Sequence, residues 1–304
     1  MNTRAKQSSA TPPSPAGENR GQILDLFLAP RSVAIIGLSR SAIGSPISVL
    51  TTLEDFGYQG RIFIVNPSMP ADAANGVFPS LEALPEAPDL AIVSVARERV
   101  LTILQDCHRR GVPAAIVITQ GFADADDEGR RLQEEIVAFA RSSGLRLLGP
   151  NTIGVANAGA NFTSSFIELH KEDSSIGQVA QSGLFMMGHH LINNEPAGFR
   201  KAVDVGNACD IGLIDVLEHY EQDEDIRVIQ CHLESVPDGA AFVETASRIS
   251  RAKPIVVLKA GKSQAGQQAV ASHTGAAAGE SEVYNAAFRK AGVVVAETRA
   301  YFDE

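Results

Sequence analysis

The feature that most limits the folds open to this chain is a repeated alternation of short apolar runs with segments of helical periodicity. In the first half, the apolar runs are Ser32–Ile36, Arg61–Val65, Leu90–Val95, Ala114–Ile118 and Leu145–Leu148. Before the last of them, apolar residues recur at helical spacing and predict an amphipathic helix: Leu132, Ile136, Phe139 and Ala140 within Asp126–Arg141. Continuous apolar strands separated by helices indicate a parallel sheet covered on both faces.

A second series with the same alternation follows. Its predicted strands are 176–180, 201–205, 226–233, 254–258 and 293–295, and its predicted helices are 184–192, 211–220, 240–251 and 280–291. The stretch between the two series has no clear period and is rich in polar residues, so we place the boundary there. We therefore expect an α/β protein with two doubly wound domains. The expected divisions are a disordered tail (1–22), a first domain (23–157), a linker (158–175) and a second domain (176–304).

Length and charge narrow the range of partners. The 304 residues suit two domains, and the net charge of -10 argues against nucleic acid or an anionic membrane as the main partner. No apolar run approaches the roughly 20 residues of a membrane span, and Met1–Arg20 lacks the apolar core of a secretory signal. Cys107, Cys209 and Cys231 have no metal-ligand spacing, so we expect small buried residues, no metal site and a cytoplasmic protein.

The turn after the first predicted strand is a candidate phosphate site. The segment Gly37–Ser45 sits where phosphates settle on a helix N-terminus in doubly wound folds. Its glycines do not fit the spacing G-x-G-x-x-G, and the second strand ends at Asn66-Pro67 without the acidic residue that an NAD ribose requires. A nicotinamide oxidoreductase is therefore disfavoured. Two interpretations stay open, a site for a nucleotide-like ligand and a glycine-rich turn that only closes a βα unit.

Two further turns resemble anion sites. Gly261-Lys262-Ser263 imitates the end of a P-loop, but the pattern requires Gly where Val256 stands. Lys259 and Lys262 remain sources of positive charge. Ser182, followed by Gly183, is a candidate N-cap, which leaves the next backbone amides available to an anion. Capping without any ligand is the plainer alternative.

His273 is the strongest candidate for covalent chemistry. It lies in the small-residue run Ala271–Gly279, which can approach a ligand closely and change conformation at low steric cost. Imidazole can take up and release a phosphoryl group. Glu234 ends a predicted strand, where a carboxylate can accept the proton of one imidazole nitrogen and leave the other nucleophilic. The alternatives are a surface histidine in a Gly/Ala turn and a solvated strand-end glutamate.

Taken together, these residues resemble the α subunit of succinyl-CoA synthetase and, more closely, the α part of the NDP-forming acyl-CoA synthetases (acetate–CoA ligase, ADP-forming). The likeness runs from about Ile23 to Glu304. It rests on a set of motifs: Ser32–Gly37, Val65-Asn66-Pro67, Gly121-Phe122, Leu148–Asn151, Gln181-Ser182-Gly183, Lys253–Lys259 and Ser272–Gly275. The resemblance implies a Rossmann-like domain that binds coenzyme A, followed by a flavodoxin-like domain that carries a phosphohistidine.

The resemblance also assigns residues. It implies that His273 is phosphorylated, that Glu234 orients it, and that Ser182, Gly183, Thr274 and Gly275 bind phosphate. The coenzyme A site would be lined by Gly37, Ser39, Arg40, Gly44, Ser45, Asn66, Pro67, Val95, Ala96, Gln120, Gly121 and Asn151. Two positions depart from the family pattern. Ser68 replaces a common Lys, which removes a charge contact to coenzyme A phosphates, and Thr152 replaces a usual Cys.

The implied reaction interconverts acyl-CoA, ADP and phosphate with a small carboxylic acid, coenzyme A and ATP, through an acyl phosphate and a phosphohistidine. Nothing in the chain looks like an ATP-grasp domain. We therefore expect ADP or ATP with Mg to bind to a separate ATP-grasp β subunit or to a fused domain. The alternative from another class is a coenzyme A-binding regulatory or scaffold protein without turnover.

Overall fold

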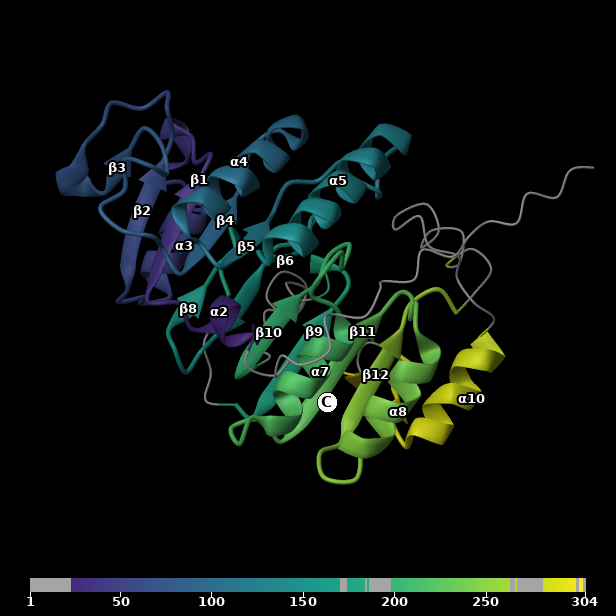
Figure 1. The fold of residues 1–304 in the computed structure, drawn as a ribbon. Helices are drawn as coiled ribbons and strands as arrows, with labels where there is room; N and C mark the ends of the chain where they lie inside the picture. Colours follow the sequence, from purple (N-terminus) through teal and green to yellow (C-terminus); the bar gives the residue numbers. More distant parts are fainter. Residues whose placement is uncertain are drawn as a thin grey trace, which may run out of the picture.

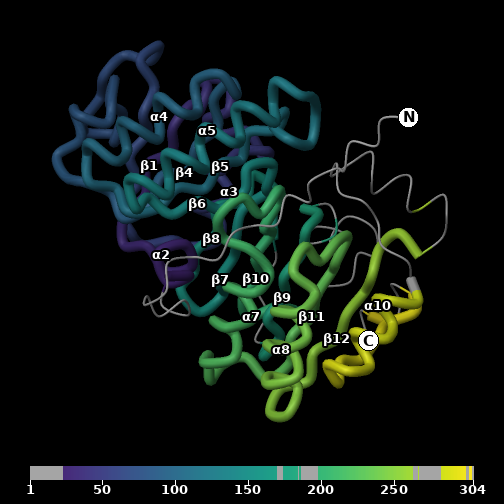
Figure 2. The backbone as a smooth tube through the Cα atoms, turned by 45° about the vertical axis from the view of Figure 1, so that its right-hand side comes forward, coloured from purple at the N-terminus to yellow at the C-terminus, as the bar shows by residue number. Residues whose placement is uncertain are grey.

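The computed structural model describes residues 23–169, 174–183, 185, 198–262, 266, 281–298 and 301–302. Over these residues the chain forms two β-sheets, each covered by helices, and the two lobes are distinct in Figures 1 and 2. The expected fold class, two α/β domains in succession, is confirmed. Within the described part, no helix is both long enough and apolar enough to span a membrane.

The first sheet is entirely parallel and has six strands. They are β1 (Ser32–Ile36), β2 (Arg61–Val65), β3 (Val77–Phe78), β4 (Leu90–Val93), β5 (Ala114–Val117) and β6 (Arg146–Leu148). Their spatial order is β3-β2-β1-β4-β5-β6, the order of a dinucleotide-binding fold. The chain reverses direction across the sheet between β1 and β4, and at such a switch point the loops diverge and leave a crevice.

The helices of the first domain are α2 (Asp25–Leu28), α3 (Val49–Asp55), α4 (Arg97–Arg110) and α5 (Asp127–Ser143), with short 3-10 turns η1 (Arg40–Ala42) and η2 (Ala73–Asn75). The expected amphipathic helix is α5. Asp126 caps its start by accepting a hydrogen bond from the Gly129 amide (2.6 Å), and Gly144 ends it in a left-handed conformation. Figure 1 shows α4 and α5 side by side on one face of the sheet.

Alternate residues of each strand in this sheet enter two different cores. Ala34, Ile36, Ala91 and Val93 pack with the apolar faces of α4 and α5. Their neighbours on the strands, such as Val33 and Ile35, belong to another core that also contains α2, α3 and buried residues of the second sheet. The period of two along a strand therefore assigns one face to the helices and the other to a core shared between the domains.

The second sheet has seven strands in the order β13-β12-β11-β9-β10-β7-β8. They are β7 (Val155–Asn157), β8 (Phe162–Thr163), β9 (Ile176–Ala180), β10 (Lys201–Asp204), β11 (Val228–Leu233), β12 (Ile255–Lys259) and β13 (Val294–Val295). Its helices include α7 (Leu213–Gln222), α8 (Gly239–Ile249) and α10 (Ser281–Ala291). The five strands from β9 onward are parallel and follow the flavodoxin order 2-1-3-4-5. The helix expected at 184–192 lies outside the described residues apart from Phe185.

The second sheet includes strands that precede the position where the sequence predicts the second domain to begin. β7 lies within the range assigned to the first domain and β8 within the range assigned to the linker, yet both belong to the second sheet. β7 pairs antiparallel with β10, and β8 pairs antiparallel with β7. The boundary between the sheets therefore falls between β6 and β7. These strands are three and two residues long, too short for a period to show in the sequence.

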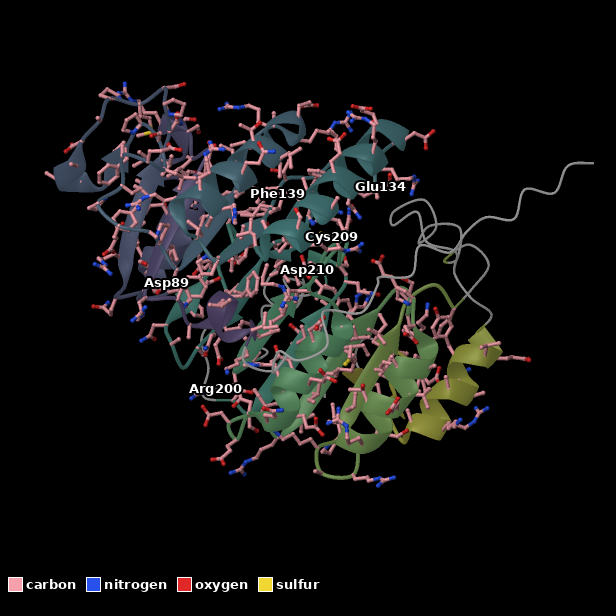
Figure 3. The ribbon with its side chains drawn as sticks, in the orientation of Figure 1. Asp89, Glu134, Phe139, Arg200, Cys209 and Asp210 are labelled. Atoms are coloured by element: carbon pink, nitrogen blue, oxygen red, sulfur yellow. The ribbon has the colours of Figure 1, made fainter. Side chains whose placement is uncertain are left out.

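Side chains tie the two domains together close to the ends of β6 and β10. The Asn207 amide nitrogen donates to Asp124 Oδ1 (2.8 Å) and to Gln133 Oε1 (2.9 Å) in the first domain. Arg146 and Asp210 form a half-buried ion pair (2.9 Å). Cys209 packs in the same core as α4 and α5, and Figure 3 shows Cys209 and Asp210 beside α5.

All three cysteines are buried, as the sequence predicts. Burial raises the pKa of the Cys107 thiol to about 12, and it raises the pKa values of Cys209 and Cys231 as well. A thiol with a raised pKa carries little thiolate at neutral pH and is a poor nucleophile. The cysteines are therefore packing residues.

Candidate functional site

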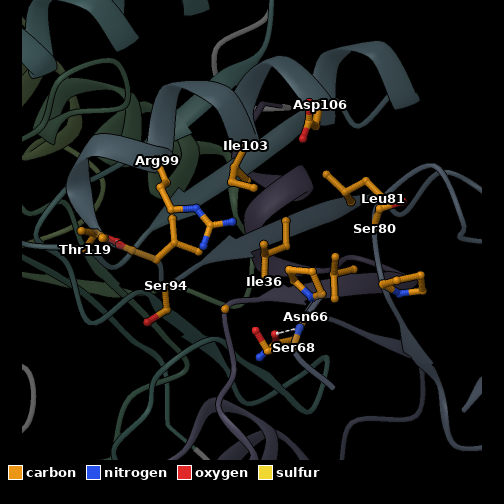
Figure 4. A pocket seen from close by; sticks show the side chains of 16 residues that line it. Ile36, Asn66, Ser68, Ser80, Leu81, Ser94, Arg99, Ile103, Asp106 and Thr119 are labelled. Atoms are coloured by element: carbon orange, nitrogen blue, oxygen red, sulfur yellow. Dashed lines mark hydrogen bonds between the residues drawn. The ribbon is translucent and has the colours of Figure 1, made fainter. Parts of the chain in front are cut away.

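A cavity of about 650 Å³ opens at the carboxyl ends of β1, β2 and β4, at the switch point of the first sheet (Figure 4). Its walls come from one face of α4 and from the loops that follow these strands and β3 and β5. The lining residues are Ile36, Gly37, Val65, Asn66, Pro67, Ser68, Pro79, Ser80, Leu81, Ser94, Val95, Ala96, Arg99, Ile103, Asp106 and Thr119. Carboxyl ends at a switch point are where open α/β sheets bind ligands.

Gly37 lets the loops after β1 and β4 approach each other at the floor of this cavity. Its φ is +94°, a left-handed conformation that residues with a Cβ rarely adopt. A Cβ placed there would lie 2.1 Å from the Ser94 carbonyl oxygen and 2.8 Å from Val95 Cγ1. The glycine is therefore needed for backbone conformation and for space at once.

Asn66 takes the position at the end of β2 where a nicotinamide site would carry an acid. Its side-chain nitrogen donates to the Leu38 carbonyl (2.8 Å), and its side-chain oxygen accepts from the Ser68 amide (2.8 Å), the bond drawn in Figure 4. Both the donor and the acceptor group of the Asn66 side chain thus hold the loops after β1 and β2 in place. This geometry agrees with the interpretation that the site does not bind a nicotinamide ribose in the usual way.

The structure brings together five of the twelve residues expected at the coenzyme A site: Gly37, Asn66, Pro67, Val95 and Ala96 line the cavity. Four others, Ser39, Arg40, Gly44 and Ser45, lie in the loop after β1 and outside that lining. Gln120 and Gly121 follow the lining residue Thr119 in the chain. Asn151 touches this wall through its backbone, because its amide donates to the Thr119 carbonyl (3.0 Å).

Sequence reasoning missed part of the lining. Arg99, Ile103 and Asp106 come from one face of α4, and their spacing of four and three residues after the strand was a usable signal. Ser80 and Leu81 follow β3, whose two residues give no detectable pattern. The short strand is what brings this segment beside Asn66.

A second group of polar residues lies at the carboxyl ends of the strands in the second sheet. Gln181 follows β9, Asp204 ends β10, Glu234 follows β11 and Lys259 ends β12. The switch point of this sheet lies between β9 and β11, beside Gln181 and Glu234. The structure thus places Glu234 and the expected phosphate turn at Ser182 at the same edge.

Gln181 fixes the turn that carries Glu234. Its side-chain oxygen accepts from the amides of Glu234 (2.6 Å) and Ser235 (2.9 Å), and its nitrogen donates to the Ser235 carbonyl (2.8 Å). Glu234 itself is only 6% exposed. A buried carboxylate on a turn held by three hydrogen bonds has a defined position, as an orienting residue requires.

Lys259 provides positive charge beside Glu234. Its ammonium donates to the Glu234 carbonyl oxygen (2.8 Å) and lies 4.5 Å from the centre of the Tyr284 ring. Burial lowers the pKa of Lys259, while the Glu234 charge acts in the opposite direction. Lys262, the other lysine considered in the sequence, bonds instead to the Ala296 carbonyl and to Glu297 (both 3.1 Å).

Asp204 is a buried carboxylate that the sequence did not single out. It is 1% exposed and accepts hydrogen bonds from the Ile153 amide (2.8 Å), the Thr152 hydroxyl (3.1 Å) and the Gly206 amide (3.2 Å). Burial raises the pKa of Asp204 to about 6, and the Glu234 charge adds to the rise. A Cβ on Gly183 would lie 2.9 Å from Asp204 Oδ2, so this carboxylate borders the expected phosphate turn.

The raised pKa of Asp204 predicts a pH effect on stability. Because the folded state holds this proton more tightly than the unfolded state does, the contribution of Asp204 to stability is fully present below about pH 4 and is lost as pH rises through about 6. The full effect on the free energy of unfolding is about 3 kcal/mol, since a difference of one in pKa corresponds to about 1.36 kcal/mol. Asp204→Asn should remove it, so the free energy of unfolding should fall less steeply with pH in the variant. Urea unfolding in half-unit steps from pH 4 to 6.5 measures the difference; parallel curves would contradict the assignment.

The two candidate sites share a wall. Thr119 of the first cavity accepts a backbone hydrogen bond from Asn151, and the next residue, Thr152, donates its hydroxyl to the Asp204 carbonyl (2.5 Å). The Asn151 side-chain nitrogen also donates to Asn207 Oδ1 (3.2 Å). Thr152, one of the two departures from the family pattern, therefore connects the loop after β6 with the second sheet.

Five expected phosphate-site residues remain, and the structure describes two of them, Ser182 and Gly183. His273, Thr274 and Gly275 lie outside the described residues. Ser182 and Gly183 are described, and the Phe185 amide donates to the Ser182 carbonyl (3.0 Å), as at the start of a helix. Their role in binding phosphate stays a prediction.

Comparison with known proteins defines the class of each domain. Residues 31–158 match the family described as CoA binding domain, and residues 173–303 match the succinyl-CoA ligase like flavodoxin domain. The two switch-point sites thus lie one in each of these domains. The fold and the matches together define a two-domain α/β protein that joins a CoA binding domain to a succinyl-CoA ligase like flavodoxin domain.

Two relatives and one solved structure extend the comparison. The chain is 36% identical over 282 residues to the acetate–CoA ligase (ADP-forming) I subunit alpha of Pyrococcus furiosus, and 34% identical over 277 residues to its counterpart II; these alignments cover 90% and 91% of the chain. The acetyl-coenzyme A synthetase 1 of Ca. Korarchaeum cryptofilum, described as dinucleotide forming and solved with phosphate and ADP, superposes with a TM-score of 0.83 at 34% identity over 93% of the chain.

Along most of its length the chain is therefore similar to the α parts of ADP-forming acetate–CoA ligases. It spans 61% and 60% of the lengths of the two Pyrococcus relatives and 61% of the Korarchaeum chain.

Proposed function

We propose that this chain is the α-type component of an ADP-forming acyl-CoA synthetase, which binds coenzyme A in the first domain and carries a phosphoryl group on His273 in the second. The observation that supports it best is the common wall of the two switch-point sites, formed by the loop Gly149–Thr152 between Thr119 and Asp204. Ligands bound in two adjacent crevices can exchange a group without long travel.

The proposed sequence has three transfers. Inorganic phosphate attacks the thioester carbon of an acyl-CoA, the carbon–sulfur bond breaks, and coenzyme A leaves with the acyl phosphate formed. An imidazole nitrogen of His273 then attacks the phosphorus, the bond to the acyl oxygen breaks, and the carboxylate leaves. Last, an oxygen of the ADP β-phosphate takes the phosphoryl group and frees His273. Positioning and electrostatics carry such transfers, which ask little covalent chemistry of the protein.

Each group in the second domain has a distinct part in this proposal. Glu234 accepts the N–H of His273 and keeps the attacking nitrogen unprotonated. The backbone amides following Ser182, together with Thr274 and Gly275, hold the phosphate oxygens. Lys259, beside Glu234, balances the negative charge that gathers when phosphate and carboxylate are present together.

The nucleotide step requires a second component. We infer that ADP or ATP binds with Mg to an ATP-grasp subunit or fused domain, where the metal would neutralise phosphate charge. The acid is a small carboxylic acid. Two observations support these assignments. The Pyrococcus relatives are named for acetate and ADP, and the Korarchaeum structure is a complex with phosphate and ADP.

The proposal can be tested on the chain alone, in the direction that needs no nucleotide. Acetyl [³²P]phosphate serves as the phosphoryl donor, and titration calorimetry measures coenzyme A binding in parallel. We expect coenzyme A to bind and the protein to acquire a label that is stable in base and lost in acid, the behaviour of phosphohistidine. Coenzyme A binding without label from acetyl, propionyl or butyryl phosphate would support the regulatory or scaffold alternative. Absence of coenzyme A binding would overturn both.

A further inference from the structure

We propose that Arg99 binds the phosphate groups of coenzyme A in the cavity of the first domain. The proposal rests on the proposed function for the identity of the ligand, but its structural basis is independent. Arg99 was not among the expected site residues, and it lies in the first turn of α4, directly above the carboxyl end of β4.

The position of Arg99 places a cation at the crevice where the sheet reverses. Its neighbours along the same face of α4, Ile103 and Asp106, also line the cavity, and Gly37 and Ser94 form the floor below. Figure 4 shows the Arg99 side chain extending from α4 toward Ile36. In doubly wound folds the phosphates of a nucleotide lie at this crevice.

The charge of Arg99 is available to a ligand. Only two residues in the lining are charged, Arg99 and Asp106, and the Asp106 carboxylate already forms an ion pair with Arg109. Within the described ranges, the Arg99 guanidinium has neither a hydrogen bond nor an ion pair with the protein. By contrast, neighbouring Arg97 is engaged by the Gly121 carbonyl (2.6 Å) and by Asp126 (3.0 Å).

The rest of the lining cannot supply this charge. The polar side chains around the cavity are neutral, among them Asn66, Ser68, Ser80 and Thr119. Two of these are already committed to the protein, because Asn66 braces the loops and the Thr119 hydroxyl donates to the Val95 carbonyl (2.7 Å). Among the described residues that line the cavity, a ligand with several negative phosphate charges therefore meets one unpaired cation, Arg99. A guanidinium suits that role because its planar fork can donate two parallel hydrogen bonds to phosphate oxygens.

The test compares three variants with the wild-type chain by titration calorimetry with coenzyme A. Arg99→Gln should weaken binding at least about tenfold, since a charge-assisted hydrogen bond is worth more than a neutral one. Arg99→Lys keeps the positive charge but lacks the planar guanidinium, so its affinity for coenzyme A should lie between those of wild type and Arg99→Gln. Arg141→Gln is the matched control, because Arg141 is an exposed arginine on the last turn of α5 outside the cavity. This variant removes the same charge from the protein, and its affinity for coenzyme A should stay within about twofold of wild type.

Salt separates a charge contact from a packing effect. Raising the salt concentration from about 50 to 300 mM should weaken wild-type binding more than Arg99→Gln binding, because screening acts on the contact that the variant lacks. Thermal unfolding should give similar Tm values for all four proteins. An Arg99→Gln variant that binds coenzyme A as tightly as wild type would overturn the proposal.

Truncated ligands identify the group contacted. Equal weakening of coenzyme A and dephospho-coenzyme A by Arg99→Gln assigns the contact to the diphosphate, and weakening confined to coenzyme A assigns it to the 3′-phosphate; both support the proposal. Equal weakening with pantetheine, which has no phosphate, would overturn it by showing damage to the cavity. A wild-type chain that does not bind coenzyme A would contradict the proposed function instead, so the two failures are distinguishable.

Discussion

A His273→Asn chain is expected to lose phosphoenzyme formation by a factor on the order of 10³ or more, while its affinity for coenzyme A stays within about twofold of wild type. Asparagine keeps the polarity and approximate size of the side chain but has no nitrogen that can attack phosphorus. The proposed coenzyme A site is the cavity of the first domain, on the far side of the Gly149–Thr152 loop, so coenzyme A binding should be spared. Incorporation of label from acetyl [³²P]phosphate measures the first quantity and calorimetry the second.

Two comparisons sharpen this prediction. His108→Asn makes the same exchange at an exposed histidine of α4 and should label at the wild-type rate. Glu234→Gln keeps the shape of the side chain but removes its charge, so labelling should slow by about 10- to 100-fold without being abolished. Wild-type labelling of the His273→Asn protein would exclude His273 as the phosphoryl carrier, and uniform slowing of all three would point to a general defect in folding.

The second large effect is expected from Gly37→Ala, which should destabilise the protein by about 4 kcal/mol and abolish measurable binding in the cavity of the first domain. The added methyl group would overlap the Ser94 carbonyl oxygen, which belongs to the backbone directly after the buried strand β4 and cannot move aside cheaply. The loops after β1 and β4 would be forced apart at the floor of the cavity. Urea unfolding gives the free energy, and coenzyme A titration gives the loss of binding.

Gly111→Ala provides the matched control for this change. Gly111 follows α4 with a φ of +83°, close to that of Gly37, but a Cβ there meets nothing within 4 Å. The variant therefore incurs the left-handed backbone strain alone, about 1 kcal/mol, and should leave ligand binding unchanged. Similar costs for the two substitutions would show that the close approach between Gly37 and Ser94 does not matter.

Much of the fold was predictable because it depends on local pattern. Strands such as Ser32–Ile36 and Ala114–Val117 are fully buried, so their continuous apolar character marks them directly. The helix Asp127–Ser143 carries both an apolar face and a capping aspartate next to it in sequence. β3, β7 and β8 were missed because two or three residues cannot display a period. β7 depends on pairing with β10, which lies far along the chain, and β8 in turn pairs with β7.

The candidate sites were likewise predictable in part. Their locations were predictable, because carboxyl ends of strands at a switch point follow from the order of elements. The role of Arg99 was not, since it depends on which neighbouring charges are already paired. Nor was Asp204, whose carboxyl group is ordinary in sequence and has its pKa raised by burial and by the charge of Glu234.

By itself, the sequence determined that this protein has two successive α/β domains, where its principal strands lie and which turns follow the carboxyl ends of those strands. Hydrophobic period and turn chemistry are properties of neighbouring residues, and they can be read without knowing the fold. Tertiary structure alone decided that β7 and β8 join the second sheet, that the loop after β6 forms a wall between the two sites, and which charges remain free. Many of those outcomes depend on contacts between residues far apart in the sequence, such as Asn207 with Asp124, 83 positions away, and Arg146 with Asp210, 64 positions away. Their energies appear only when the chain has folded.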